Sequence, residues 1–315
     1  MEKGVNLDKK DFESILSNYN IGKYKKSKYI FTAGKKVFKI STIKGTYILK
    51  LYQVSSSKFI KFQFQLLKYL EKSGVPVPKI VSTKKGEDIL VYKKKDIEIQ
   101  EFIRGKEVLY PNRELTKDLG KEIGILDKAL LNFKGKIIKD KIDSQEFSKV
   151  RIKTLREINL EKESKNILRE IDGLDKDKLK KGLIHRDICE GNFLVRDNKV
   201  VAIIDWADMG KAFLVQELAV PISHNLCTKR VARRELIKLL LKEYQKAIKL
   251  NDEEIKALYL FVKYRSLGSC LWCIEQAFIH KNRYKQLMRW AEHCILRYKA
   301  FNKISLPEFL ELARG

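Results

Sequence analysis

The sequence predicts an α+β fold with a small β-rich N-terminal lobe and a larger helical C-terminal lobe. Its N-terminal third contains short aromatic runs that alternate in polarity, as half-buried strands do. The remainder is dominated by long runs of Leu, Ile, Lys and Glu at helical spacing, with one strand-like interruption, FLVRDNKVVAIID. We therefore expect an N-terminal lobe over residues 1–100, a connector over 101–105 and a helical lobe over 106–315.

The N-terminal lobe is predicted to hold strands around one helix. Gly34 and Gly45 mark turns between strand-like runs. Residues 58–72 carry apolar side chains at helical spacing, and Pro76 and Pro78 forbid a continuation of that helix. The expected strands are 28–40, 45–52, 88–95 and 96–103.

The C-terminal lobe is predicted to hold helices and one hairpin. Within the strand-like interruption, two apolar runs flank Asp197 and Asn198, a pair that is typical of a two-residue hairpin turn. The expected helices are 114–133, 145–170, 233–250, 252–280 and 282–300.

The composition excludes several classes of protein. A hydrophobic fraction of 44% excludes a wholly disordered chain. No apolar run approaches the roughly 18 residues of a membrane-spanning helix, and the first residues do not form a secretory signal. The five cysteines are an odd number in a long chain, so we expect a reducing, cytoplasmic setting rather than a disulfide scaffold.

The net charge of +26 is carried mainly by lysine, with 51 Lys against 15 Arg. Nucleic-acid sites also favour the planar fork of arginine, so this balance indicates a solvated lysine surface rather than a nucleic-acid partner. An anionic partner of another kind is the alternative reading of the charge.

The segment LIHRDICEGNFLVRDNKVVAIIDW, residues 183–206, carries the strongest signal of chemistry. It places Asp187 after His185, Asn192 five residues later, and Asp205 at the end of the hairpin. Phosphoryl transfer needs a carboxylate that accepts the proton of an alcohol, and an amide oxygen with a second carboxylate that hold Mg²⁺ against the phosphates. The spacing and the strand context together favour this reading over a surface loop with chance Asp and Asn residues.

These residues resemble the aminoglycoside phosphotransferase and choline kinase superfamily, which has a protein-kinase-like two-lobed fold. The resemblance extends through KGTYILKLY, GVPVP, IQEFIRGKE and Glu217-Leu218-Ala219, and so covers nearly the whole chain. Within the superfamily, the chain is most similar to the spore coat CotS-type kinase-like proteins of Gram-positive spore formers. The resemblance implies ATP and Mg²⁺ as cofactors.

The resemblance also implies roles for individual residues. Asp187 matches the catalytic base, and Asn192 and Asp205 match the metal ligands. Lys50 matches the lysine that reaches the nucleotide phosphates, and its position between Leu49 and Leu51 on a strand favours that role over one more surface lysine. Three further residues match nucleotide-binding positions: Gly34 in the loop over the phosphates, and Glu101 and Ile103 in the connector whose backbone holds adenine. His185 is expected to orient the loop rather than to act as an acid.

The chain departs from the family pattern in ways that bear on the rate of catalysis. Gln63 stands where the helix is expected to supply a Glu to pair with the lysine, so a charge-assisted contact is lost. The loop that contains Gly34 has one glycine, Ala207 replaces a frequent acid, and Glu217 replaces a usual Asp. The Asp205-Trp206-Ala207 run is not D-F-G and no A-P-E follows, which argues against a protein kinase.

Three other groups of residues have two readings each. Cys270, Cys273 and the His293-Cys294 pair suggest zinc, but an apolar helix without a knuckle turn favours buried cysteines. The aromatic residues of the last helices line a substrate pocket or, at helical spacing, more often the core. A basic cluster before residue 235 is read as a helix face. The aromatic residues are Trp272, Trp290, Tyr298 and Phe301. The basic cluster consists of Lys229, Arg230, Arg233 and Arg234.

The sequence thus favours a Mg-ATP-dependent phosphotransferase that acts on a hydroxyl of a small molecule or of a surface glycan component, and that is linked to the spore coat. The alternative is a catalytically weak or inactive kinase-fold structural protein of the spore coat, with other coat proteins as partners. Intact Asp187, Asn192 and Asp205 favour the enzyme. Gln63 and the glycine-poor loop favour the structural protein.

Overall fold

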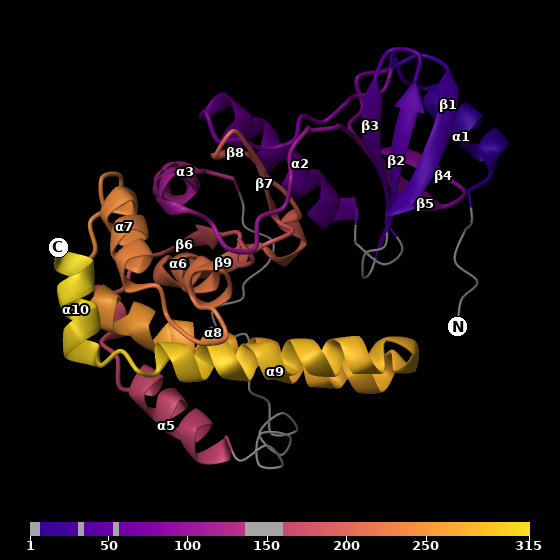
Figure 1. The fold of residues 1–315 in the computed structure, drawn as a ribbon. Coiled ribbons are helices and arrows are strands. Elements are labelled where there is room, and N and C mark those ends of the chain that lie inside the picture. Colours follow the sequence, from indigo (N-terminus) through magenta and orange to yellow (C-terminus); the bar gives the residue numbers. More distant parts are fainter. Residues whose placement is uncertain (1–6, 31–34, 53–56, 136–159) are drawn as a thin grey trace. The chain divides into compact units, whose positions relative to one another are not determined.

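A computed structural model describes residues 7–30, 35–52, 57–135 and 160–315 of the 315-residue chain (Figure 1). The predicted phosphate loop with Gly34 lies outside these described residues. The chain divides into two compact units. Unit 1 comprises Met1–Arg104 and Phe133–Ile138, and unit 2 comprises Gly105–Asn132 and Lys139–Gly315.

Unit 1 is built on a five-stranded sheet with the order β1-β2-β3-β5-β4, in which every neighbouring pair is antiparallel (Figure 1). The helix over Ser57–Lys72 (α2) begins and ends close to the predicted bounds. The helix over Lys9–Leu16 (α1) was missed, although its Asp8 cap and Asp11 form a capping box. The strands are β1 (Tyr24–Ile30), β2 (Lys35–Thr42), β3 (Thr46–Tyr52), β4 (Leu90–Tyr92) and β5 (Lys95–Glu101).

The two faces of this sheet differ in chemistry because successive side chains of a strand point in opposite directions. On one face Leu49 and Leu51 are fully buried in a cluster with Phe12 of α1. The other face carries Lys50 and the side chain of Tyr52, which packs against α2. The alternation predicted around Lys50 is therefore confirmed, and Lys50 is 8% exposed rather than a surface lysine.

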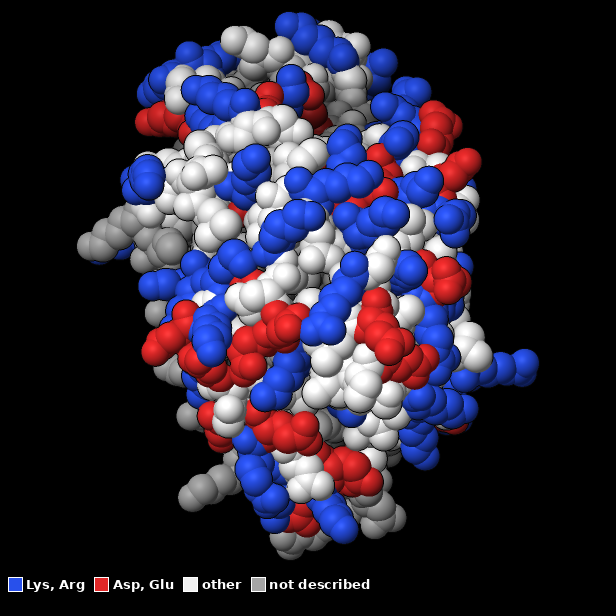
Figure 2. Space-filling view, turned by 90° about the vertical axis from the view of Figure 1, so that its left-hand side faces the viewer, with Lys and Arg blue, Asp and Glu red and all other residues white. Residues whose placement is uncertain are grey.

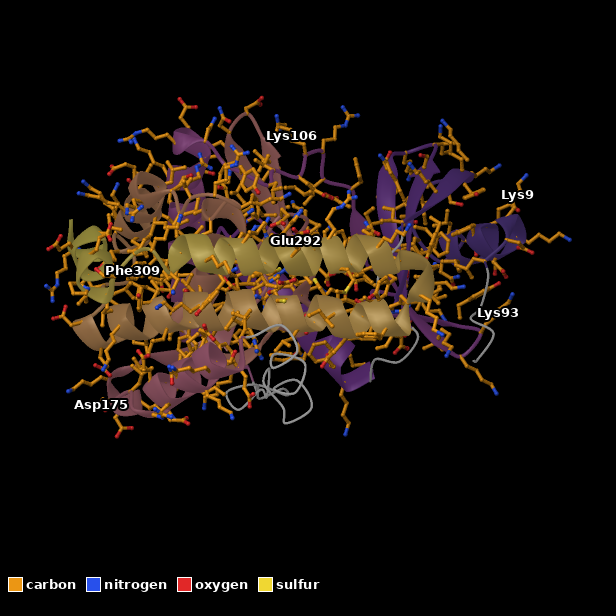
Figure 3. All side chains as sticks on the ribbon, turned by 60° about the horizontal axis from the view of Figure 1, so that its bottom comes forward. Lys9, Lys93, Lys106, Asp175, Glu292 and Phe309 are labelled. Carbon is orange, nitrogen blue, oxygen red and sulfur yellow. The ribbon has the colours of Figure 1, made fainter. Side chains whose placement is uncertain are left out.

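Unit 2 is mainly helical, and its long helices α8 and α9 lie side by side (Figures 1 and 3). β7 and β8 form the predicted hairpin, with Asp197 and Asn198 at φ 51° and 56° in its turn. A second pair, β6 with β9, was not predicted. The helices are α3 (Arg113–Asn132), α5 (Glu161–Asp172), α6 (Val215–Pro221), α7 (Arg234–Tyr244), α8 (Asp252–Ile279), α9 (Tyr284–Phe301) and α10 (Leu306–Arg314). The strands are β6 (Lys181–Ile184), β7 (Phe193–Arg196), β8 (Lys199–Ile203) and β9 (Gly210–Phe213).

Most helices of the second half agree with the sequence to within a few residues, and the α+β class is confirmed. Only the end of the predicted helix over 145–170 can be compared, because residues 136–159 lie outside the described residues. The predicted helix over 233–250 is shorter than expected and ends as α7 at Tyr244. Helix α10 was not predicted, and its Phe309 is fully buried against Tyr259 and Phe301 (Figure 3).

The core of unit 2 decides between the two readings of its cysteines and aromatic residues. Cys270, Cys273 and Cys294 are buried in one apolar cluster between α8 and α9, as small hydrophobic side chains. Tyr298 and Phe301 belong to the core, whereas Trp272 and Trp290 are 45% and 40% exposed, so the core reading is wrong for the two tryptophans.

The surface charge is dispersed on the face shown in Figure 2, where Lys and Arg side chains spread widely and Asp and Glu side chains lie among them. The basic cluster before residue 235 is not a helix face, because Lys229 and Arg230 lie in a bend before α7. Arg234 begins that helix and pairs with Glu308 of α10 at 2.5 Å. Among the described helices, no segment has the length and apolar character needed to span a membrane.

Candidate active site

The loop after β6 is held in place by His185, whose side chain is fully buried. Its Nδ1 accepts a hydrogen bond from the backbone N–H of Asp187 at 3.2 Å. Nε2 therefore carries the proton and donates to the carbonyl of Ile204 at 2.9 Å. The ring also packs edge-on against Trp206. His185 thus ties the loop to the end of β8, and its predicted orienting role fits these contacts.

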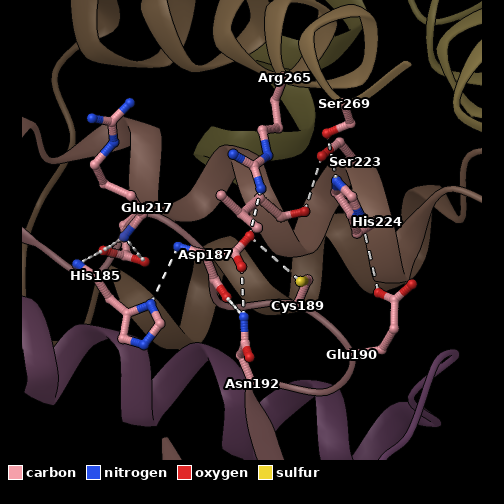
Figure 4. Close-up of polar contacts among 12 residues, drawn as sticks. His185, Asp187, Cys189, Glu190, Asn192, Glu217, Ser223, His224, Arg265 and Ser269 are labelled. Carbon is pink, nitrogen blue, oxygen red and sulfur yellow. Dashed lines mark hydrogen bonds and ion pairs between the residues drawn. The ribbon is translucent and has the colours of Figure 1, made fainter. Parts of the chain in front are cut away.

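Glu217 of α6 holds the same loop from the other side (Figure 4). Its fully buried carboxylate accepts hydrogen bonds from the backbone N–H groups of His185, at 2.5 Å, and Arg186, at 3.1 Å. Burial raises the pKa of Glu217, while the hydrogen bonds from the backbone N–H groups of Arg186 and His185 act to lower it. Glu217, which stands where the family usually has Asp, therefore still accepts hydrogen bonds from two backbone N–H groups of the loop.

Asp187 lies at the centre of the polar cluster in Figure 4. One carboxylate oxygen contacts Nη2 of Arg265 from α8 at 2.5 Å. The other accepts from Nδ2 of Asn192 at 2.6 Å. Both oxygens are therefore oriented, and an oriented carboxylate is the kind of group that can accept a proton from an alcohol.

Asn192 and Asp205 come from adjacent points of the hairpin, because the carbonyl of Asn192 accepts from the N–H of Ile204 at 2.8 Å. Asn192 uses its amide nitrogen on Asp187, so its amide oxygen is the ligand atom that it can offer to a cation. Asp205 follows β8 in a left-handed backbone conformation, φ 62°. An amide oxygen beside a carboxylate is the donor set that Mg²⁺ prefers, so these residues fit the implied metal.

Lys50 in unit 1 has a carboxylate partner that the sequence did not predict. Glu98 of β5 is its direct cross-strand neighbour and approaches its Nζ to 3.6 Å. Glu98 is fully buried and also accepts hydrogen bonds from Tyr52 and Gln100. The charge-assisted contact that Gln63 cannot provide is thus made by another residue. The acid comes from the sheet rather than from α2.

The predicted adenine connector continues from β5. Glu101 is the last residue of that strand, and its N–H donates to the carbonyl of Lys79 at 2.9 Å. Phe102 donates in the same way to Thr46, and Ile103 follows it. The roles of Glu101 and Ile103 in nucleotide binding stay predictions.

Three side chains near Asp187 were missed, namely Glu190, His224 and Arg265. Potential ligand atoms of Cys189, Glu190 and His224 lie within 4.8 Å of one another. Burial and then the charges of Arg265 and Arg297 lower the pKa of His224, and the same positive field opposes a bound cation. Glu190 stands inside the recognised motif, whereas His224 and Arg265 lie far along the chain, where no local pattern marks them.

Known proteins resemble this chain in sequence and in fold. The family model described as "Phosphotransferase enzyme family" matches residues 33–247. The homoserine kinase of Zymomonas mobilis is 24% identical over 240 residues, which cover 71% of this chain and 72% of that protein. A homoserine kinase of Pseudomonas aeruginosa is 22% identical over 224 residues, or 69% and 70% of the two chains.

Solved structures show the same fold over nearly the whole chain. An amicoumacin kinase solved with AMP-PNP and Ca²⁺ has a TM-score of 0.71 at 19% identity, covering 95% of this chain and 98% of its own. A microcompartment-associated aminopropanol kinase has a TM-score of 0.69 at 14% identity, covering 97% and 100%. These likenesses confirm a kinase-like fold. Because the family model spans more than half of the sequence and includes the loop of Asp187, the chain belongs to the phosphotransferase enzyme family.

Proposed function

We propose that this phosphotransferase moves the γ-phosphoryl group of MgATP to a hydroxyl group of a small molecule. The observation that carries the proposal is the orientation of Asp187 by Arg265 and Asn192, with Asp205 at the adjacent end of the hairpin. A carboxylate that is oriented through both oxygens beside an amide and a second carboxylate matches the needs of phosphoryl transfer.

In the proposed reaction, the acceptor oxygen forms a bond to the γ-phosphorus while the bond from that phosphorus to the β–γ bridging oxygen breaks. The hydroxyl proton passes to Asp187, and ADP leaves. Asn192 and Asp205 would hold Mg²⁺, which supplies neutralisation of the phosphate charge. His185 and Glu217 keep the loop in position through the hydrogen bonds to its backbone.

The nucleotide roles of unit 1 are part of the proposal. Lys50, oriented by Glu98, would contact the phosphates. The backbone of Glu101 and Ile103 would bind adenine, and Gly34 would let its loop approach the phosphates. The pairing of Lys50 with Glu98 weakens the alternative of an inactive structural protein. Although residue 63 is a neutral glutamine, Lys50 still has a carboxylate partner.

The acceptor is proposed to be a small hydroxylated compound, and a surface glycan component is the second candidate. The relatives named above act on homoserine, aminopropanol and amicoumacin according to their names, which supports small acceptors with polar substituents. Association with the spore coat rests on the CotS-type resemblance alone.

Thermal unfolding with ATP, with and without Mg²⁺, tests the nucleotide part of the proposal. MgATP at about 100 times its Kd should stabilise the fold by about 2.7 kcal/mol. Phosphorus NMR then follows ATP with L-homoserine, 1-amino-2-propanol, an aminoglycoside and free hexosamines. No stabilisation of the folded protein by millimolar MgATP would exclude the enzyme. Binding without turnover of any acceptor would favour the structural protein.

A further inference from the structure

The turn between α8 and α9 carries a group of large apolar side chains on the protein surface. Phe278 and Ile279, the last two residues of α8, are 65% and 66% exposed. Tyr284 begins α9, is also exposed, and packs its ring edge-on against the ring of Phe278. A cluster of exposed apolar side chains of this size is typical of an interaction site.

The two exposed tryptophans extend this group along both helices. Trp272 precedes Ile279 by seven residues, so it lies on the same side of α8, about 10 Å back from the end of the helix. Trp290 of α9 has the guanidinium of Arg283 over its ring, at 5.6 Å. The turn between the two helices lies at the end of the pair away from α10 (Figure 1). We call the following residues the apolar tip: Trp272, Phe278, Ile279, Tyr284 and Trp290.

The charged residues of this segment are all basic. The chain from Gln276 to Ala291 contains no Asp or Glu, and its cations are Lys281, Arg283, Lys285 and Arg289. Apolar, aromatic and cationic side chains together are the set that binds the surface of a bilayer with anionic lipids. The apolar groups enter the hydrocarbon, tryptophan and tyrosine stay at the level of the headgroups, and the cations contact the lipid phosphates.

A bilayer fits the apolar tip better than a second copy of the chain does. Two tips that meet would bring their basic residues against one another, and like charges across an interface are unfavourable. An anionic bilayer attracts the same residues. The order along the helices also suits a bilayer, because Phe278 and Ile279 lie at the very end and Trp272 lies about 10 Å behind them.

We propose that the apolar tip inserts into the surface of a bilayer that contains anionic phospholipids and attaches the protein there peripherally. Arg265, which contacts Asp187, precedes Ile279 by fourteen residues in the same helix, and so lies about 20 Å from its end. The lipid contact is therefore separate from the reacting group, and it does not depend on the proposed function.

The probes are vesicles of phosphatidylcholine alone and vesicles of equal parts phosphatidylcholine and phosphatidylglycerol. Sedimentation of the full chain with each kind of vesicle gives the bound fraction. We expect binding to the mixed vesicles at least tenfold tighter than to phosphatidylcholine alone. That binding should weaken as salt is added, because exposed charges are screened.

The three tryptophans of the chain give a direct readout of the inserted surface. Trp206 is buried in unit 2, whereas Trp272 and Trp290 belong to the apolar tip. Quenching of tryptophan fluorescence by phospholipids with brominated acyl chains therefore reports contact between the tip and the lipid. We expect such quenching in the parent protein with mixed vesicles.

The double variant Phe278→Glu/Ile279→Glu replaces the two most exposed side chains of the tip by acids. Its matched control is Ile43→Glu/Val91→Glu, which changes the net charge equally at apolar residues of unit 1 that are 59% and 67% exposed. Because all four positions are exposed, both proteins should keep the stability of the parent, which thermal unfolding checks. The tip variant should lose vesicle affinity at least tenfold together with the quenching, and the control should keep both.

A second variant, Lys281→Gln/Arg289→Gln, leaves every apolar residue of the tip in place. It should weaken binding to the mixed vesicles at least fivefold, because both cations lie at exposed positions beside the tip. It should leave binding to phosphatidylcholine alone unchanged. The charge contribution is thus measured even if the acidic double variant fails to fold.

Four results would overturn the proposal. The parent protein binds neither kind of vesicle, or it binds phosphatidylcholine alone as tightly as the mixed vesicles. The tip variant binds as tightly as its matched control, which would assign attachment to the dispersed lysine surface. Finally, brominated lipids leave the tryptophan fluorescence of the parent unchanged, while sedimentation shows dimers that the tip variant cannot form. That result would assign the apolar tip to a second copy of the chain.

Discussion

Glu98 of β5 lies directly opposite Lys50 of β3, and the hydrogen-bonding register of the sheet holds the two side chains together at 3.6 Å. Glu98 has no exposed surface, and Tyr52 and Gln100 donate to its carboxylate. Because both charged residues belong to one sheet, the lysine is oriented without an acid from helix α2.

Glu98→Gln should weaken MgATP binding about tenfold, since a charge-assisted contact of Lys50 contributes roughly 1.5–3 kcal/mol. Gln63→Glu in the same background should restore part of that affinity. Gln63 is buried and lies three residues after Ile60 and one before Phe64, which both pack against Tyr52, so the new acid faces the same side of the sheet. Calorimetric titration with MgATP measures both effects.

Gln63→Ala is the control for this pair of variants and should change the affinity little. Lys50→Ala should weaken MgATP binding at least as much as Glu98→Gln does. Equal affinities for Glu98→Gln and the parent protein would show that the sheet does not orient the lysine. A large loss of MgATP affinity in Gln63→Ala would show that α2 orients the lysine instead.

The contrast between Gln63 and Glu98 shows what the sequence could and could not predict. Local patterns located β3, α2, the β7–β8 turn and the motif of Asp187, because strand alternation, helix breakers and turn residues act over a few positions. The partner of Lys50 depends on which strands become neighbours and in which register. That choice is made by burial of the whole sheet, so no local pattern contains it.

Arg265 was also not predicted, because its role depends on packing between helices rather than on a local pattern. It lies within the long helix α8, whose buried and exposed residues give no local sign of a site. Its contact with Asp187 arises only when α8 packs beside α6. The short helix α1, by contrast, had a readable capping box at Asp8 and Asp11, and a search for caps would have found it.

Asp187→Asn should lower phosphoryl transfer about 100-fold or more while MgATP still binds, because the lost group is the proposed proton acceptor and not a proposed nucleotide contact. The asparagine oxygen can still accept from Arg265 or Asn192, so the loop stays folded. Asp205→Asn should weaken Mg²⁺-dependent ATP binding as well as turnover, since a charged ligand is lost. Titration with MgATP and a transfer assay on both variants provide the comparison.

If Asp187→Asn abolishes nucleotide binding in folded protein, the division of roles between Asp187 and Asp205 is wrong. If the parent protein binds MgATP but shows no turnover, and Asp187→Asn is indistinguishable from it, the structural-protein alternative gains support.

Glu217→Ala should destabilise the protein by about 3 kcal/mol or more. Two buried backbone N–H groups, of His185 and Arg186, lose their charged acceptor, and each such loss costs roughly 1–3 kcal/mol. Ser223→Ala nearby is the control, because Ser223 is about as buried and its hydroxyl donates to the carbonyl of Val220 in its own turn rather than to the loop of Asp187. Urea unfolding of both variants gives the difference. Equal stabilities would mean that Glu217 does not support the loop.

Glu190 should give the protein a pH-dependent stability. Burial raises the pKa of Glu190 from 4.5 to about 7, although the charge of Arg297, 3.8 Å away, acts in the opposite direction. Between these two pH values the folded protein keeps a proton that the unfolded chain has released. The free energy of unfolding must therefore fall as the pH rises from about 4.5 to about 7, and the loss is complete above the folded pKa.

Glu190→Gln removes this titration while keeping the shape of the side chain, so its unfolding free energy should fall less over the same pH range. Between pH 4.5 and 7 the decreases in unfolding free energy of the two proteins should differ by about 2.5 kcal/mol. His224 beside Glu190 is present in both proteins, so the pH dependence that its own titration causes enters both curves. Urea unfolding of both proteins at several pH values between 5 and 8 measures the slopes. Parallel curves for the two proteins would show that Glu190 titrates like an exposed carboxylate, and that the cluster around Asp187 is more solvated than its contacts imply.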